Sequence, residues 1–426
     1  MVWPETQPAI RYSPPVSTDQ LLLTHPDPPT PRHLRLEVDG ARLRRCTWRG
    51  SGKERCSSRD FPNHEAARDA LAREAAARMR EGFAYVRDAA GTPPGEPVLR
   101  CAPPNRYGPQ TFDLHPQGHT LAVASLRRDA YGADLHLVEV ATGRRRLVHT
   151  EAPGSGPTGQ TFIHAVLFDA DGTGLVYALN GETRHLDLAT GTTRVLAHYE
   201  HLGNARFNHF CTRPAQDATR RRLLLFDAGD QVRVRDTGTG EDVLVVPVAD
   251  RPECRAGALS PSGRLLALAF GVDDSIVQVW HVETGQLLHS TPFPFPFSGT
   301  TGRTGIRDLG FDPGERFLVA AGGFAEGPFA LPVGGDTLAW AVPDPYRTDR
   351  YGTCFGWQYS PSGDLLAIGG RLGATLHLPD GAPSPVPLAL SHTGRTHRVV
   401  FSADGTLLAC GGDSGRLSVH RVTGQP

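Results

Sequence analysis

One phrase decides the fold of this chain, because it recurs with the same length and pattern. The clearest copies read Ala258-Leu-Ser-Pro-Ser-Gly-Arg-Leu-Leu-Ala267, Gln358-Tyr-Ser-Pro-Ser-Gly-Asp-Leu-Leu-Ala367 and Val400-Phe-Ser-Ala-Asp-Gly-Thr-Leu-Leu-Ala409. Each predicts an apolar strand, a tight turn that contains glycine, and a second apolar strand. Weaker copies lie at residues 113–122, 167–176 and 310–319. The chain is therefore built by repetition of one unit.

The turns of this phrase recur at a regular interval. The turn residues are Gly118, Gly172, a degenerate copy near residues 216–219, Gly263, Glu315, Gly363 and Gly405. Successive turns are about 48 residues apart, which is typical of propeller blades. A strand ending in Thr-Gly and a short apolar strand follow most turns, so each unit predicts four short antiparallel strands. We therefore predict a mostly β chain with a seven-bladed β-propeller over residues 97–426.

The two ends of this region complement each other. The last unit stops after its third strand, and an orphan apolar segment, Pro97-Val-Leu-Arg-Cys101, precedes the first unit. We expect this segment to pair with residues 417–422 and to close the ring, because closure removes exposed strand edges.

The repeats resemble WD repeats. The residues that carry the resemblance are His392-Thr-Gly-Arg-Thr-His-Arg-Val-Val-Phe-Ser-Ala-Asp-Gly405, and residues 277–285 with Trp280. His281 follows Trp280 where the family has Asp, so most of the family's His-Asp-Trp hydrogen-bond network is absent. The resemblance covers residues 97–426 and implies a propeller whose partners bind at the mouth of the central channel.

The N-terminal part differs in kind. Residues 1–31 hold eight prolines, which predicts a flexible, extended arm. Residues 32–87 predict a small α+β module, with a helix that begins after Asn63 and stops at Gly82. Residues 88–96 predict a linker to the propeller.

The α+β module resembles a WGR domain. The matching segments are Trp48-Arg-Gly-x-Gly-Lys53, Phe61-x-x-x-Glu-Ala-Ala and Gly82-Phe-x-Tyr85, with Trp-Arg-Gly in place of the family's Trp-Gly-Arg. The family includes poly(ADP-ribose) polymerases, so the resemblance implies contact with DNA.

Charge points to the same module. Residues 32–87 hold 13 Arg and 1 Lys against 8 acidic residues, a net charge of +6, so the rest of the chain is at −7. A basic module predicts a polyanion partner, DNA or RNA. The candidate contact residues are Arg44, Arg45, Trp48, Arg49 and Lys53. The simpler alternative is a set of solvated arginines on a helix face.

A second candidate site comes from aligning the units on their turns. The residues eight positions before the turn include His164, Arg255, Arg307, Phe355 and His397. This position opens the innermost strand, and two Arg and two His there could hold an anion or an acidic peptide of a protein partner. The alternative is that residues opening a strand are simply polar and exposed.

Catalytic motifs are missing from the sequence. It contains no G-x-S-x-G, no H-E-x-x-H and no phosphate-binding glycine-rich loop. We therefore expect no enzyme activity, no cofactor and no metal, and predict an interaction scaffold or adaptor that binds protein partners at the channel mouth. The alternative is an enzyme or small-anion binder that uses the channel.

Cysteine usage and hydropathy bear on the compartment. The seven cysteines are odd in number and form no C-x-x-C pair, so we expect neither disulfides nor a zinc site. No signal peptide or membrane-spanning segment is evident, and we expect a cytoplasmic protein that does not bind membranes. The Phe-Pro alternation at residues 291–297 predicts a loop.

Overall fold

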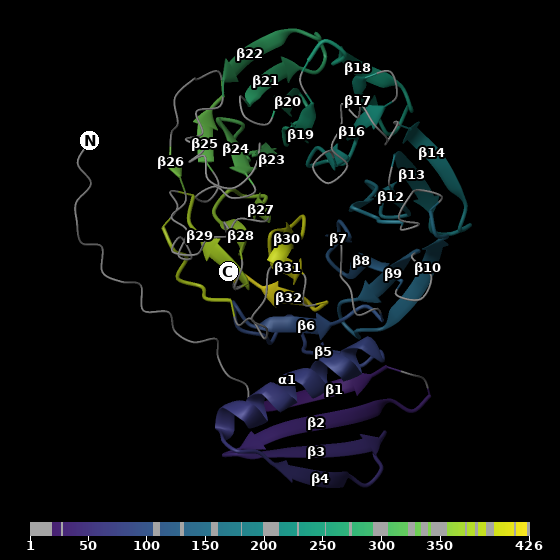
Figure 1. Cartoon of the computed structure of the whole chain (residues 1–426), viewed down its shortest axis with the longest axis vertical. Coiled ribbons are helices and arrows are strands. Elements are labelled where there is room, and N and C mark those ends of the chain that lie inside the picture. The colour runs from purple at the N-terminus through teal and green to yellow at the C-terminus, as the bar shows by residue number, and fades with distance from the viewer. Residues whose placement is uncertain are drawn as a thin grey trace, which may run out of the picture.

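Seven sheets surround a common centre in the computed structural model, and an eighth sheet with a helix lies to one side (Figure 1). The sheet count refers to the residues that the structure describes. These are residues 19–26, 29–104, 111–127, 132–154, 161–179, 181–198, 213–227, 230–251, 253–271, 275–292, 306–322, 329–333, 340–341, 356–370, 373–379, 382–388, 396–412 and 415–423. Within them, no helix has the length and apolar character needed to cross a membrane.

The N-terminal sheet has the order β1-β2-β3-β4 and is antiparallel. Its strands are β1 (Gln20–His25), β2 (Arg32–Asp39), β3 (Arg42–Arg49) and β4 (Arg55–Asp60). Because β1 pairs with β2 along its whole length, the sheet begins inside the segment expected to be a flexible arm. In the run Leu21-Leu22-Leu23, strand alternation places Leu21 and Leu23 in the core and leaves Leu22 exposed, which explains the extra strand.

Helix α1 (His64–Arg80) covers one face of this sheet. Its start is confirmed, since the Asn63 side chain accepts a hydrogen bond from the Ala66 N–H (2.8 Å). Its end is confirmed at Gly82, where φ is +101°. Leu71 and Met79 pack with the apolar residues of β2 to form the core of the module.

The other seven sheets are called I to VII in chain order. Sheet I contains β7 (Thr111–Leu114), β8 (Thr120–Leu126), β9 (Ala133–Glu139) and β10 (Arg145–Glu151). Sheet II contains β11 (Ala165–Phe168), β12 (Gly174–Leu179), β13 (Glu182–Asp187) and β14 (Thr193–His198). Sheet III contains β15 (Ala215–Gln216), β16 (Arg222–Asp227), β17 (Gln231–Asp236) and β18 (Asp242–Pro247). Sheet IV contains β19 (Cys254–Leu259), β20 (Leu265–Phe270), β21 (Ile276–His281) and β22 (Leu287–Pro292). Sheet V contains β23 (Ile306–Phe311), β24 (Phe317–Gly322), β25 (Phe329–Pro332) and β26 (Trp340–Ala341). Sheet VI contains β27 (Gly356–Tyr359), β28 (Leu366–Gly370) and β29 (Gly373–His377). Sheet VII contains β30 (Thr396–Phe401), β31 (Leu407–Gly412), β32 (Leu417–Arg421), β6 (Pro97–Cys101) and β5 (Tyr85–Val86). In Figure 1, β7, β19, β23, β27 and β30 lie nearest the centre.

The repeated turn has one hydrogen-bond design. Its left-handed residue donates its N–H to the carbonyl three residues earlier in all seven described turns, at Gly118, Gly172, Arg220, Gly263, Glu315, Gly363 and Gly405. In five turns, a Ser or Asp side chain at that earlier residue also accepts the N–H five residues ahead of it, as Ser402 does from Leu407 (2.9 Å). In the third turn, the left-handed residue is Arg220, with φ +59°. It lies one residue beyond the range 216–219 expected from the sequence.

Sheet VII joins the two ends of the propeller region. Strand β32 pairs antiparallel with β6, with Leu417 opposite Cys101 and Val419 opposite Leu99, as the sequence predicted for these two segments. The residues expected to be a linker pack here as well. Arg421 donates to the carbonyls of Ala90 (2.7 Å) and Thr92 (2.9 Å), so this segment is attached to the sheet.

The α+β module also contacts the propeller directly. Strand β5 pairs with β6 and extends sheet VII. From the propeller side, Arg416 donates to the Ala72 carbonyl (3.1 Å) and Arg145 donates to the Arg80 carbonyl (3.3 Å), both in α1. Helix α1 therefore lies between its own sheet and the propeller, and the opposite face of that sheet points away.

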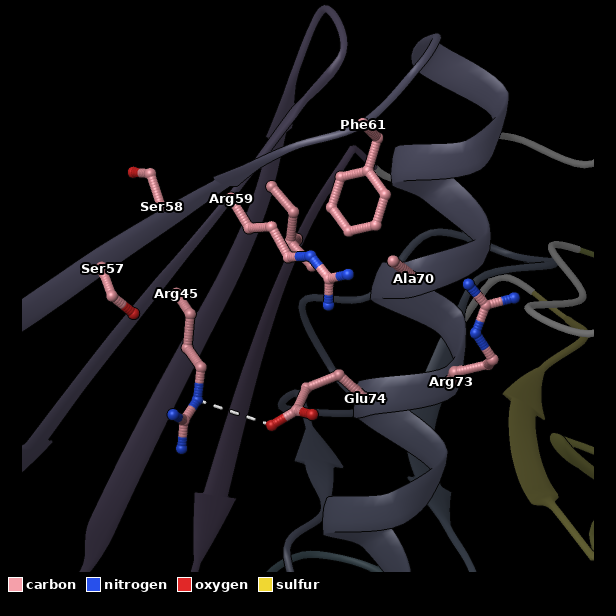
Figure 2. Close-up of a pocket in the computed structure, with 9 residues that line it drawn as sticks. Arg45, Ser57, Ser58, Arg59, Phe61, Ala70, Arg73 and Glu74 are labelled. Carbon is pink, nitrogen blue, oxygen red and sulfur yellow. Dashed lines mark ion pairs between the residues drawn. The ribbon is translucent and has the colours of Figure 1, made fainter.

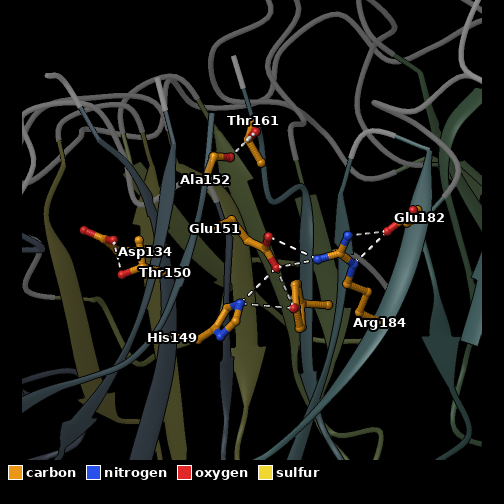
Figure 3. A network of polar contacts seen from close by, with 9 residues as sticks. Asp134, His149, Thr150, Glu151, Ala152, Thr161, Glu182 and Arg184 are labelled. Carbon is orange, nitrogen blue, oxygen red and sulfur yellow. Dashed lines mark hydrogen bonds and ion pairs between the residues drawn. The ribbon is translucent and has the colours of Figure 1, made fainter. Parts of the chain in front are cut away.

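A buried polar network joins sheets I and II (Figure 3). The Glu151 carboxylate accepts hydrogen bonds from Tyr177 (2.7 Å) and Arg184 (3.1 Å), and lies 2.9 Å from Nε2 of His149. Burial opposes ionisation of Glu151, but these contacts outweigh it and lower the pKa of the carboxyl group. The network fastens the outer strand of one sheet to its neighbour.

Two cysteines contradict the expectation of no disulfide. Cys46 and Cys56 are joined by a disulfide and lie directly opposite each other on β3 and β4. The hairpin register brings them together across ten residues, a spacing that carries no sequence signature. The described free cysteines, Cys101, Cys254 and Cys410, are buried in strands.

Candidate functional site

Three charged side chains from non-neighbouring sheets interact electrostatically at the centre of the propeller. They are Arg213, just before β15 in sheet III, Asp308 on β23 in sheet V, and Arg398 on β30 in sheet VII. Each stands seven residues before the left-handed residue of its turn, a place called position −7 below. Because these sheets are not adjacent, their side chains can interact only across the central space.

The other four residues at position −7 are small or medium-sized. They are Thr111, Ala165, Ala256 and Gly356. The position −7 ring therefore combines two arginines and one aspartate with residues of little bulk.

Desolvation by the surrounding protein is the largest cause of the pKa shifts of the charged groups at position −7. Desolvation raises the pKa of Asp308, and the charges of Arg213 and Arg398 only partly oppose it. Desolvation also lowers the pKa of Arg398, although the carboxylate of Asp113 favours the charged form. Arg398 is anchored by a hydrogen bond from Nε to the Phe112 carbonyl (2.6 Å). Among the described residues, Nε of Arg213 is buried without a hydrogen-bond partner.

A second charged pair joins Asp113 on β7 to Arg220, the left-handed residue of the turn between β15 and β16. Arg220 donates to the Asp113 carboxylate (2.7 Å) and to the Phe168 carbonyl (2.8 Å), and so connects sheet III to sheets I and II. The Asp113 carboxylate also accepts the Phe168 N–H (2.8 Å). Asp113 also favours the charged form of Arg398, so the pair and the three residues at position −7 form one group. These five described residues, three arginines and two aspartates, have a formal net charge of +1.

The residues predicted from the sequence stand one place earlier, at position −8. His164 and Arg255 are buried, and Arg255 pairs with Glu253 (3.1 Å). Arg307 and His397 lie on β23 and β30, but their side chains and the whole of Phe355 are outside the described residues. Whether the five side chains converge therefore stays a prediction.

The backbone at position −8 is irregular in three sheets. The strand register shifts at Arg255, Arg307 and His397, so each is the extra residue of a β-bulge. Bulges redirect side chains and are common beside functional sites. Sequence reasoning missed position −7 because unit three could not be aligned without a glycine; placing its turn at Arg220 aligns Arg213 with Asp308 and Arg398.

The five nucleic-acid candidates do not form one surface. Arg45 lies on the face of the sheet that carries α1, where it pairs with Glu74 (3.5 Å), whereas Arg44 and Trp48 point to the opposite face. Trp48 stacks on His33 with ring centroids 5.0 Å apart. Arg49 ends β3 and Lys53 lies in the loop that follows, and both are exposed. Strand alternation separates these neighbours in the sequence, so the candidates on β3 are divided between the two faces of the sheet. Their contact with nucleic acid stays a prediction.

One described group has the donor atoms of a metal site. Ligand atoms of Cys46, Glu54 and Cys56 lie within 4.8 Å of one another. The two sulfur atoms are bonded to each other, so neither offers the thiolate that a metal would need.

Comparison with solved structures identifies the architecture. A chain of the structure titled "Crystal Structure of Mitotic Checkpoint Complex" is similar, with a TM-score of 0.55 and 15% sequence identity, over 79% of this chain and 94% of that chain. The chain has a WD-repeat propeller fold. No protein-family model matches it, and no curated protein matches it. At 15% sequence identity, the similarity between the two chains shows a shared fold and nothing about function.

Proposed function

We propose that this protein is a non-enzymatic interaction scaffold, a closed seven-bladed propeller that binds an acidic segment of a protein partner at the centre of its ring. The pairing of β32 with β6 supports closure, since it links the first and last parts of the propeller region. The single observation that carries the function is the convergence of Arg213, Asp308 and Arg398 from three non-neighbouring sheets.

The proposed contact follows from the charges. Arg398 is already held in place by the Phe112 carbonyl, so it loses little conformational freedom on binding. Arg213 has an unused buried donor among the described residues, and an incoming carboxylate would satisfy it. We include the position −8 residues Arg255, Arg307, His164, His397 and Phe355 in the same site as its predicted outer level.

A capture experiment with matched variants tests this proposal. The immobilised full chain, exposed to nuclease-treated native lysate, should retain a partner that the double variant Arg213→Gln, Arg398→Gln loses. With the purified partner, affinity should fall at least tenfold, as expected when hydrogen bonds between charged groups are lost, about 1–3 kcal/mol each. Arg146→Gln on the exposed outer strand β10 is the control and should bind normally. Equal binding by the double variant would refute the site.

The alternative of an enzyme or small-anion binder in the channel rests on the same arginines. Inorganic phosphate and sulfate are suitable probes, measured by calorimetry on the full chain. Saturable binding of either anion that disappears in the Arg213→Gln variant, with no partner captured, would favour this alternative.

Contact of the α+β module with nucleic acid, and its resemblance to WGR domains, remain predictions from the sequence. Arg44 and Trp48 share the face of the sheet that points away from the propeller, and Arg42 lies on that face too. If nucleic acid binds, this face is the place where reversing the charge of Arg44 should weaken it.

A further inference from the structure

Strand β4 is the edge strand of the N-terminal sheet, and it is exposed along its whole length. All six of its residues are exposed, and among the described strands it pairs only with β3. An edge strand presents a row of unpaired N–H and C=O groups that can accept another strand. Charged residues such as Arg55 and Arg59 protect such an edge from copies of itself, yet they leave it open to a partner of opposite charge.

A groove lies beside this edge, between the sheet and α1 (Figure 2). Its volume is about 420 Å³. The floor is apolar, formed by Leu43, Phe61 and the small residue Ala70. On β4, Ser57 directs its hydroxyl group to this face, whereas the Ser58 side chain points to the other face (Figure 2). Because α1 packs chiefly on β2 and β3, the α1-facing side of β4 is left as one wall of the groove.

The rim of the groove is basic. Arg45, Arg59 and Arg73 line it together with a single acidic residue, Glu74. Glu74 pairs with Arg45 (3.5 Å), and the Arg59 guanidinium lies over the Phe61 ring, 5.1 Å from its centroid. Among the described residues, neither Arg59 nor Arg73 pairs with a carboxylate. Two cationic groups therefore border an apolar floor beside a free strand edge.

We propose that this β4–α1 groove binds an extended acidic peptide of a partner protein, which adds to the sheet as a fifth strand along β4. The peptide backbone would pair with the free edge of β4, and alternate side chains would point into the groove. There, a carboxylate or phosphate would meet Arg59, Arg73 would add positive charge from α1, and a neighbouring apolar group would pack on Phe61 and Leu43. This site goes beyond the proposed function at the ring centre, with which it shares no residue.

Several features favour a peptide over nucleic acid. The free edge offers backbone hydrogen bonds that only a polypeptide can complete as a ladder. A floor of Leu43, Phe61 and Ala70 suits aliphatic groups, and the carboxylate of Glu74 would repel a run of phosphates. The Cys46–Cys56 disulfide holds β4 against β3, so the edge is fixed before the peptide arrives.

Labelled octapeptides test the inference on the full-length protein by fluorescence anisotropy. The probes alternate valine and threonine around a central glutamate, phosphoserine or glutamine. The glutamate and phosphoserine peptides should bind at least tenfold more tightly than the glutamine peptide, and their relative affinities distinguish a carboxylate from a phosphate ligand. Of two versions N-methylated on alternate residues, one should lose binding at least tenfold, because it cannot complete the ladder along β4.

Matched variants locate the site. Arg59→Glu and Arg73→Glu should each weaken the acidic peptides at least tenfold, whereas Arg44→Glu on the opposite face and Arg146→Glu on the exposed strand β10 should leave affinity within twofold. Peptide binding that is lost in the Arg213→Gln, Arg398→Gln variant but unchanged in both groove variants would lie at the ring centre and would overturn the inference. Equal binding of acidic and neutral peptides, or insensitivity to both groove variants, overturns the inference. So does binding of a labelled single-stranded or duplex oligonucleotide that depends on Arg59 when no peptide binds.

Discussion

At the scale of single residues, Glu151 shows how one side chain can hold two sheets together. Glu151 is the last residue of β10, and its carboxylate accepts hydrogen bonds from Tyr177 on β12 and Arg184 on β13 of the next sheet (Figure 3). Burial makes the Tyr177 hydroxyl a weak acid, raising its pKa, so it remains a hydrogen-bond donor at neutral pH. Loss of the carboxylate would leave the Tyr177 and Arg184 donors without this acceptor in a low-dielectric interior.

We predict that Glu151→Ala lowers the free energy of unfolding by about 2–4 kcal/mol, in the range for removing one partner of a buried charged pair. Thermal and denaturant unfolding measure it, with the exposed Glu283→Ala as a control that should change stability by less than about 0.5 kcal/mol. The folded pKa of Glu151 is depressed, so its contribution is present above the usual glutamate pKa. The difference between wild type and variant should therefore shrink as the pH falls below about 4.5. A difference that does not change between neutral and acidic pH would contradict the ionic role.

At the scale of secondary-structure elements, β4 depends on few interactions. Its residues are exposed on both faces, so its attachment comes from the ladder with β3, an exposed pair between Arg42 and Asp60, and the Cys46–Cys56 disulfide. An exposed ion pair contributes little. The covalent link is then the strongest restraint on this strand.

We predict that Cys46→Ser, Cys56→Ser makes β4 open more often. Removal of a short disulfide loop costs about 2–3 kcal/mol in the chain-entropy account, and the effect should be confined to the N-terminal module. Hydrogen exchange of the amides in β3 and β4 measures it, and amides of β20 in sheet IV serve as the internal control. The same variant should bind the acidic octapeptides more weakly. Unchanged exchange in β4 would show that the ladder alone holds the strand.

At the scale of the whole molecule, sheet VII couples the two ends of the propeller region and the α+β module. Leu99 and Val98 of β6 are buried with Leu417 and Val419 in one apolar cluster. Strand β5 extends the same sheet, and Arg416 and Arg145 attach α1 to the propeller. Stability of the ring should therefore depend on β6 far more than its five residues would suggest.

We predict that a chain beginning at residue 108 unfolds at a lower temperature and with lower cooperativity than a chain beginning at residue 96. Both lack the module, but only the longer one retains β6. Exposure of two large apolar side chains costs about 3–6 kcal/mol, and the open edge of β32 favours aggregation. Calorimetry with light scattering measures both effects. Identical melting of the two chains would show that the ring does not need β6.

The sequence by itself determined the elements of this protein, because their signals are local. The Ser-Pro-Ser-Gly phrase specifies a strand, a left-handed turn and a strand within ten residues, and Asn63 and Gly82 bound a helix by their own hydrogen bonds and backbone freedom. Pairing of Pro97–Cys101 with the last unit was also predictable, since one segment lacked a partner and the other lacked a strand.

Only the tertiary structure decided which side chains meet. Arg213, Asp308 and Arg398 are about 90 residues apart in sequence, and ring geometry alone brings them to one centre. Arg44 and Arg45 are neighbours in sequence, yet the strand period of two sends them to opposite faces. Cys46 and Cys56 meet because of a hairpin register, and Glu151 finds its partners across a sheet boundary. Local pattern carries no information on such contacts, because they depend on how whole elements are placed against one another.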